Sequence, residues 1–269
     1  ERRQRRRFAD STLMRFSALK VLAWSVLCAA QLSCSASALA ERLDPNDWLN
    51  AMAAAVQDTS YEGTVIRVRD GEVEVLKVAH TVRDGVVHEK VVSQEGDGLE
   101  IIRKGNEVHC ILPDSRSVLI EEWDDQSTLF STLPSSEVRF GSEYDVSIVR
   151  EERVAGRRAL LLAIRPHDAY RYGHRIWLDA ESAFPLQTQR IGTDGDPIEQ
   201  VKFADIRLSR SIDPDLLAPS VDTSGFRWVN QAPRHSGHAI TTDWRAAELP
   251  RGFRAVATHG ETLPGSDDV

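Results

Sequence analysis

Cysteine is scarce in this sequence, which has three among its 269 residues. Cys28 and Cys34 lie in an N-terminal stretch that we expect to be removed, and Cys110 then stands alone. A chain with a single thiol cannot form an internal disulfide. Cys110 lies in the apolar, strand-like run 108–112, so we expect a buried and unreactive side chain.

Long hydrophobic runs are also lacking. The most apolar stretch, residues 18–30, follows a basic segment and precedes small residues that end at Ala40. This order is typical of a secretory signal peptide, so we expect residues 1–40 to be the signal, with cleavage after Ala40. Met14 is a natural initiator, which would make residues 1–13 upstream sequence. The alternatives are a membrane anchor, for which the run falls short of the ~20 apolar residues that a bilayer requires, and a lipoprotein signal with Cys34 as the modified residue.

Basic residues are outnumbered by acidic ones. The chain carries 33 Lys and Arg against 41 Asp and Glu, a formal net charge of −8. The first forty residues hold seven of the basic and two of the acidic residues, so the part after Ala40 has a net charge of −13. Such an acidic domain repels phosphate backbones, and we expect no nucleic-acid partner.

The motifs of the common catalytic sites are missing. There is no GxSxG nucleophile elbow, no HExxH zinc motif, no P-loop and no glycine-rich dinucleotide-binding turn. Asp194 and Asp196 lack the further acidic ligands of a calcium loop, so a hairpin turn is the better interpretation. The acidic run 121–125 is typical of a solvated rim, with a paired-carboxylate hydrolase as a distant alternative. We therefore expect no enzyme, no cofactor and no bound metal.

What the sequence does contain is one helix followed by many short strands. Asp44 and Pro45 suit a helix N-terminus, Trp48 and Met52 give the helix an apolar face, and Thr59 ends it. We expect strands at 65–68, 72–82, 86–93, 99–104, 107–112, 117–122, 144–150, 158–165, 171–179, 186–193 and 198–208, with short helical pieces at 125–130 and 212–217. The Asp-Gly and Gly-Asn pairs between strands are typical of hairpins, which join antiparallel neighbours. The predicted fold class is α+β, a curved antiparallel sheet with one buried side and a helix to cover it.

The domain organisation follows from composition. We expect the main domain to span residues 41–220. Residues 222–238 are rich in Ser, Gly, Asn and Pro and show no periodicity, which favours a linker over 221–240. Residues 241–269 would begin a small C-terminal domain. About thirty residues cannot bury a core alone, so we expect that domain to be incomplete.

A cluster of aromatic and basic residues is the candidate ligand- or partner-binding surface. Its members are Tyr170, Arg171, Tyr172, Arg175, Trp177 and Phe184. In a strand over 171–179, the period of two places Arg171, Arg175 and Trp177 on one face. Two guanidinium groups about 7 Å apart can bind carboxylates or phosphates, and Trp177 adds a flat apolar contact. The alternative is core packing together with cross-strand pairing to acids.

Several segments, taken in their order and spacing, resemble the MucB/RseB family. They are Trp48-Leu49 with Met52, Tyr61-Glu62-Gly63, Glu100-Ile101-Ile102-Arg103, Tyr170-Arg171-Tyr172, Trp177-Leu178-Asp179 with Pro185-Leu186, and Leu249-Pro250-Arg251-Gly252-Phe253. The resemblance covers roughly residues 45–256. It implies a large domain similar to the carriers LolA and LolB, a strongly curved antiparallel sheet that forms an unclosed β-barrel covered by helices. The linker and a truncated small C-terminal domain would follow.

The resemblance also implies a function. Members of the family are periplasmic negative regulators of the envelope-stress sigma factor. They bind the periplasmic segment of an anti-sigma factor and shield it from proteolysis, and their cavity implies sensing of lipid-bearing molecules such as lipopolysaccharide or lipoprotein. We expect the same here, with the chain held at the inner membrane through its partner and a homo-oligomer left open. The alternative is a periplasmic lipoprotein or lipid carrier of the LolA/LolB type, which would not need a second domain.

Overall fold

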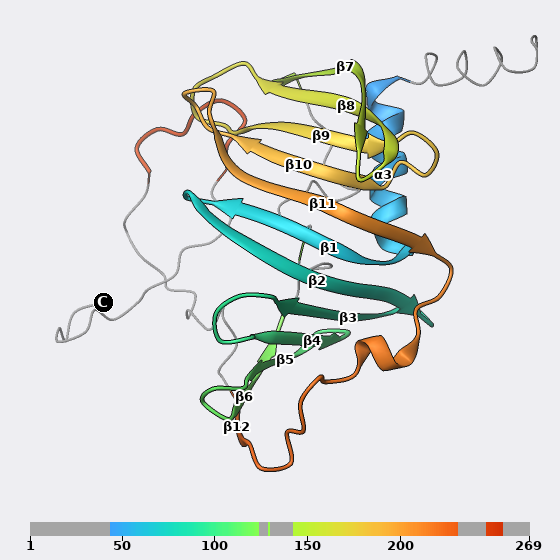
Figure 1. Ribbon diagram of the computed structural model, residues 1–269. Helices are drawn as coiled ribbons and strands as arrows, with labels where there is room; N and C mark the ends of the chain where they lie inside the picture. Colours follow the sequence, from blue (N-terminus) through green and yellow to red (C-terminus); the bar gives the residue numbers. More distant parts are fainter. Residues whose placement is uncertain (1–43, 124–128, 130–141, 231–245, 255–269) are drawn as a thin grey trace, which may run out of the picture. The chain divides into compact units, whose positions relative to one another are not determined.

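The computed structural model describes residues 44–123, 129, 142–230 and 246–254 (Figure 1). The α-helix and the 3-10 helix among them are α3 (Pro45–Asp58) and η1 (Pro214–Leu217). The strands are β1 (Ser60–Arg69), β2 (Glu72–Arg83), β3 (Val86–Ser93), β4 (Glu100–Lys104), β5 (Glu107–Leu112), β6 (Ser117–Glu122), β7 (Tyr144–Val154), β8 (Arg157–Pro166), β9 (Gly173–Asp179), β10 (Pro185–Ile191), β11 (Pro197–Ser209) and β12 (Arg227–Asn230). No helix in these residues combines the length and the hydropathy of a membrane span.

The strands form a single open sheet in the order β12-β6-β5-β4-β3-β2-β1-β11-β10-β9-β8-β7. Neighbouring strands are antiparallel except β12, which runs parallel to β6. Because β12 and β7 lie at opposite ends of this order, the sheet does not close. The predicted fold class, an unclosed antiparallel sheet with a covering helix, is confirmed. β12 itself was not predicted, and it lies inside the segment expected to be a linker.

Hairpin turns keep the successive antiparallel strands in register. The Asp70-Gly71 turn between β1 and β2 has φ values of 53° and 83°, and the Asp84-Gly85 turn between β2 and β3 has 52° and 75°. Two consecutive positive φ values belong to the type I′ turn, whose twist matches that of the flanking strands. Glycine at the second position avoids the strain that a Cβ would cause there.

Helix α3 covers one face of the sheet. It begins at Pro45, as predicted, and Trp48 and Met52 are buried. They pack against alternate residues of two strands, namely Leu160, Leu162, Ile164, Ile176 and Leu178. Successive side chains in a strand point to opposite faces, so Leu161, Ala163 and Trp177 lie on the face away from α3. These three are also buried, which shows that the sheet is covered on both faces at β8 and β9 rather than on one face as predicted.

A second cluster fills the middle of the sheet. The rings of Tyr61, Phe184 and Phe203 meet there, with centroids 4.9 to 6.1 Å apart. Ala55 and Val56 near the end of α3 pack against this cluster. The period of two then places Glu62, Thr64 and Lys77 on the opposite face, away from α3.

Several charged residues are buried. In β4, Glu100 and Arg103 are each 3% exposed, while Ile101 is partly buried and packs against the central cluster. Two further buried groups are hydrogen-bonded to each other, because His80 Nδ1 lies 2.9 Å from Glu89 Oε2. Such groups are tolerated in an interior only where they have partners, and residue type alone does not reveal those partners. Cys110 is buried, as expected, and forms no disulfide with another described residue.

Candidate functional site

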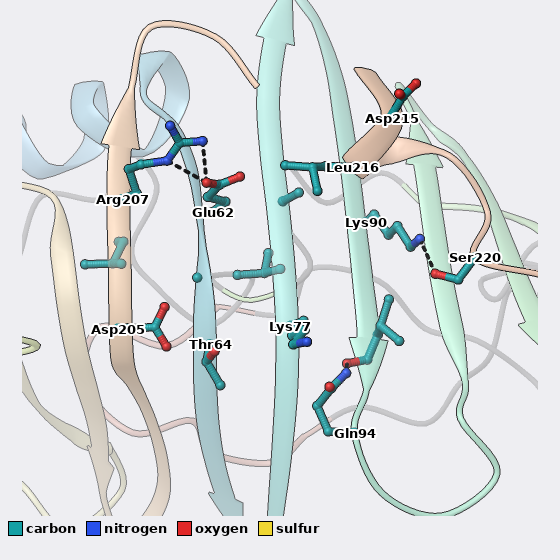
Figure 2. Close-up of a pocket in the computed structure, with 15 residues that line it drawn as sticks. Glu62, Thr64, Lys77, Lys90, Gln94, Asp205, Arg207, Asp215, Leu216 and Ser220 are labelled. Carbon is teal, nitrogen blue, oxygen red and sulfur yellow. Dashed lines mark hydrogen bonds and ion pairs between the residues drawn. The ribbon is translucent and has the colours of Figure 1, made fainter. Parts of the chain in front are cut away.

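A groove of about 810 Å³ lies on the face of the sheet away from α3 (Figure 2). It is larger than the other hollows described here, and strands β1, β2, β3 and β11 form its floor. One wall is the segment that joins β11 to β12, residues 210–226, which includes η1 and places Leu216 over the groove. The lining residues are Glu62, Gly63, Thr64, Lys77, Val78, Ala79, Lys90, Val92, Gln94, Asp205, Ile206, Arg207, Asp215, Leu216 and Ser220.

A buried lysine fixes the 210–226 segment to the sheet. Lys90 Nζ on β3 donates hydrogen bonds of 2.6 Å to the Ala218 carbonyl and to Ser220 Oγ. It also lies 3.5 Å from Glu100 Oε2, and the same carboxylate accepts a hydrogen bond of 2.9 Å from the Ser220 amide. Arg83 adds a hydrogen bond to the Ile212 carbonyl at 2.9 Å. The wall of the groove is thus held by charge-assisted hydrogen bonds, which are among the stronger ones.

The groove floor combines charged and apolar side chains. Glu62 and Arg207 pair across β1 and β11. Asp205, Thr64 and Lys77 lie side by side on three neighbouring strands. Asp205 and Lys77 are exposed, and within the described residues neither has a hydrogen-bonded or ionic side-chain partner. The groove thus offers charges of both signs beside apolar residues such as Val92 and Ile206.

A smaller hollow of about 420 Å³ contains part of the predicted cluster. Arg175 and Trp177 both line it, which agrees with their predicted position on one face. Trp177 is largely buried, and its indole Nε1 donates a hydrogen bond of 2.7 Å to Glu152 Oε2. This hydrogen bond, with a further contribution from Arg150, lowers the pKa of Glu152.

Arg171 does not lie in the same strand as Arg175 and Trp177. Strand β9 begins at Gly173, so Arg171 belongs to the preceding turn. Its guanidinium pairs with Asp168, donates to the Arg251 carbonyl and stacks on the Phe253 ring, with 4.4 Å to the ring centroid. The side chain is only 9% exposed. Arg171 therefore connects the sheet to the described residues 246–254.

The remaining members of the predicted cluster have different surroundings. Phe184 is fully buried in the central cluster, so it is a core residue and cannot contact a ligand on the surface. Tyr170 and Tyr172 are 69% and 50% exposed. The Tyr172 ring lies 5.4 Å from the Arg190 guanidinium, a cation–π contact. Sequence reasoning missed Arg165, which lines the hollow together with Arg175, because only the strand register reveals that the two are neighbours.

Within the described residues, no group of three or more His, Cys, Asp or Glu side chains is arranged to hold a metal. Of the acidic run 121–125, Glu121 is buried and accepts a hydrogen bond of 2.7 Å from the indole of Trp123. Residues 124 and 125 lie outside the described residues, as do most of the predicted helix at 125–130, the signal peptide and most of residues 241–269.

The fold is an open antiparallel sheet with a groove and a basic hollow on the face away from α3. Comparison with known proteins assigns the family. The model of the MucB/RseB N-terminal domain matches residues 44–221, and the chain belongs to the MucB/RseB family.

Curated relatives and solved structures agree with this assignment. The sigma factor AlgU regulatory protein MucB of Pseudomonas aeruginosa is 28% identical over 226 residues, which cover 84% of this chain and 68% of that protein. The sigma-E factor regulatory protein RseB of Escherichia coli is 25% identical over 224 residues, which cover 82% and 68%. The structure of the Pseudomonas aeruginosa MucA/MucB complex matches with a TM-score of 0.62 and 26% identity, over 84% of this chain and 74% of that chain. A crystal structure of MucB in complex with MucA(peri) matches with a TM-score of 0.60 and 27% identity, over 83% and 72%.

Proposed function

We propose that this protein is a non-enzymatic, periplasmic negative regulator of an envelope-stress sigma factor, and that it acts by binding the periplasmic segment of the anti-sigma factor. The observation that supports this most strongly is the likeness, over 84% of the chain, to the structure of MucB with MucA. The names of the curated relatives, which describe sigma-factor regulators, support the same role. Export would follow from a signal peptide cleaved after Ala40, and the linker at 221–240 would lead into a small C-terminal domain.

The groove is the surface that we propose for the anti-sigma segment. Exposed Lys77 and Asp205 offer one charge of each sign, and Val92, Ile206 and Leu216 add apolar contacts, which suits a polypeptide of mixed polarity better than an acyl chain. A segment seated between the sheet and residues 210–226 is withdrawn from a protease. Binding there would thus shield the anti-sigma factor from proteolysis.

The second part of the proposal concerns sensing. We propose that Arg175 and Trp177, which line the smaller hollow, and the exposed Tyr170 and Tyr172 bind lipid-bearing envelope molecules, lipopolysaccharide or lipoprotein. Exposed aromatic rings suit acyl chains and sugars, and an arginine suits their anionic groups. Arg171 touches both the turn before this surface and residues 251–253, so it offers a physical link between the surface and the C-terminal segment.

Binding of the anti-sigma segment tests the first part. The chain that begins after residue 40 is mixed with the purified periplasmic segment of the anti-sigma factor, and the complex is measured by gel filtration and by protection from a site-specific protease. We expect a stoichiometric complex and slower cleavage. Lys77→Glu should weaken binding about tenfold, because it reverses a charge in the groove. Lys104→Glu, an equal change at an exposed position of β4 outside the groove, should have no effect.

The lipoprotein or lipid carrier is the alternative function, and the open sheet is the feature that favours it. Affinity purification from periplasm and membranes separates the two. Recovery of lipoprotein in stoichiometric amount without the anti-sigma factor would contradict the regulator and support the carrier.

A further inference from the structure

The hollow beside Trp177 has a concentration of positive charge, and its Arg175 and Trp177 belong to the surface proposed above for lipid-bearing envelope molecules, so the inference made here rests on that proposal. It lies on the face away from α3 and is lined by Arg150, Arg165 and Arg175, with Ala163, Trp177 and Gln189 as the other main contacts. Three arginines in one hollow are unexpected in a chain with a net charge of −8. We propose that these arginines form a binding site for a phosphate group, carried either by a lipid headgroup or by a soluble phosphate ester.

Two of the three guanidinium groups are available. Arg165 and Arg175 are exposed, and within the described residues neither takes part in an ion pair or in a side-chain hydrogen bond. Asp145 lies opposite Arg165 in the register of β7 and β8, but its carboxylate is bonded to His167 Nε2 at 3.0 Å. Among the described residues, no side chain occupies the guanidinium donors of these two arginines, so both can donate hydrogen bonds to a ligand.

The third arginine is shared. Arg150 pairs with Glu152, and Glu152 also accepts the hydrogen bond from the Trp177 indole. The Glu152 carboxylate is thus held by two donors of its own. This arrangement keeps the Glu152 carboxylate occupied and reduces its repulsion of an anion.

The strand register places the two free guanidinium groups at a suitable separation. Ala163 lies directly opposite Arg175, and Arg165 is two residues further along β8 on the same face. Such diagonal neighbours are about 7 Å apart at the backbone, so their long side chains can approach one anion from two sides. A guanidinium presents a planar fork of donors that matches phosphate oxygens, and two forks from different directions suit a tetrahedral dianion better than a planar carboxylate.

The surroundings also leave room for the rest of the ligand. The small side chain of Ala163 lies between the arginines, and the Trp177 ring provides an apolar wall. Arg165 and Arg175 line a second hollow of about 300 Å³ as well, which Gly173 and Gly192 help to form. The two arginines thus stand between two hollows. A phosphate held by them can carry a substituent on either side.

Direct binding measurements on the full chain test the proposal. The probes are inorganic phosphate, followed by ³¹P NMR, and vesicles of phosphatidylcholine with and without phosphatidic acid, followed by co-sedimentation. The variant Arg165→Gln/Arg175→Gln removes both free guanidinium groups. The control Arg210→Gln/Arg227→Gln removes the same charge from exposed positions outside the hollow. We expect the first variant to weaken phosphate binding about tenfold or more and the control to leave it unchanged.

The two probes distinguish the source of the phosphate. Binding to inorganic phosphate and to the vesicles with phosphatidic acid supports a headgroup ligand, and binding to phosphate alone supports a soluble ester. Binding to neither probe, or equal binding by the double variant, overturns the proposal. If the double variant does not fold, as judged by circular dichroism, Arg175→Lys replaces it. That variant keeps the charge but loses the fork, so unchanged affinity there also overturns the proposal.

Discussion

The attachment of the 210–226 segment to the sheet can be tested through one buried charge. Lys90→Met keeps the length and apolar stem of the side chain but removes the ammonium group. The change deletes two hydrogen bonds of 2.6 Å, to Ala218 and Ser220, and leaves Glu100, 3% exposed, without its cation at 3.5 Å. Removal of one partner of a buried pair costs about 3–5 kcal/mol, because the remaining charge stays desolvated. We expect Lys90→Met to lower the free energy of unfolding by about 3 kcal/mol, the lower end of this range, because release of the segment would admit water to Glu100.

Two measurements check this expectation. Urea denaturation gives the loss of stability, and hydrogen exchange reports whether the amides of residues 212–220 lose protection. Lys104→Met, at an exposed position of the adjacent strand β4, is the matched control and should change stability by less than about 0.5 kcal/mol.

A double variant separates the two contributions. In Lys90→Met/Glu100→Leu the orphaned carboxylate is removed as well, so the combined loss should be smaller than that of Lys90→Met alone. A loss below about 1 kcal/mol for Lys90→Met, with unchanged exchange at residues 212–220, would refute the reasoning. It would show that the segment is held by other contacts.

Three further predictions concern other parts of the molecule. Gly63→Ala should lower the free energy of unfolding, measured by heat or urea, by about 1–3 kcal/mol, because a Cβ there would lie 2.3 Å from the Asp205 carbonyl oxygen. Unchanged stability would show that β1 and β11 can separate without cost. Trp177→Phe should raise the pKa of Glu152, seen by NMR titration, because the indole hydrogen bond is the largest cause that lowers it; an unchanged titration would contradict this. Burial, followed by the nearby charge of Arg190, lowers the pKa of His174 in the folded protein. As pH falls, the unfolded chain therefore binds the proton first. The stability that neutral His174 contributes is present in full above about pH 6.5 and is lost below it. His174→Gln should therefore lose less stability than the wild type between about pH 7.5 and pH 5.5, and an equal loss would exclude His174 as the cause.

The sequence was sufficient to predict elements whose signals are local. The helix at Pro45–Asp58 has an N-terminal signal and an apolar face, and the hairpins carry Asp-Gly pairs that need positive φ at both turn residues. β12 has no such signal. Its four residues become a strand because residues 227–230 pair with residues 117–120, more than a hundred positions earlier in the chain.

The candidate site was predictable only in part, for a related reason. The period of two correctly placed Arg175 and Trp177 on one face. The same rule failed for Arg171, because β9 begins two residues later and Asp168 holds the preceding turn. Composition predicted an exposed role for Phe184, but its ring completes an aromatic cluster whose other members come from β1 and β11. In these cases the position of the side chain depends on the register between strands that are distant in sequence.

The charges on the face away from α3 fall into two groups with different physical roles. Lys90 and Glu100 are buried and bonded to each other and to the 210–226 segment, so their replacement must affect folding. Lys77, Arg165 and Arg175 are exposed and have no described partner, so their replacement removes little that stabilises the fold. Stability alone gives no reason for three solvent-exposed cations to line the groove and the hollow beside Trp177 in an acidic protein. Their position is explained if the fold uses one group to shape this face and the other to bind ligands on it.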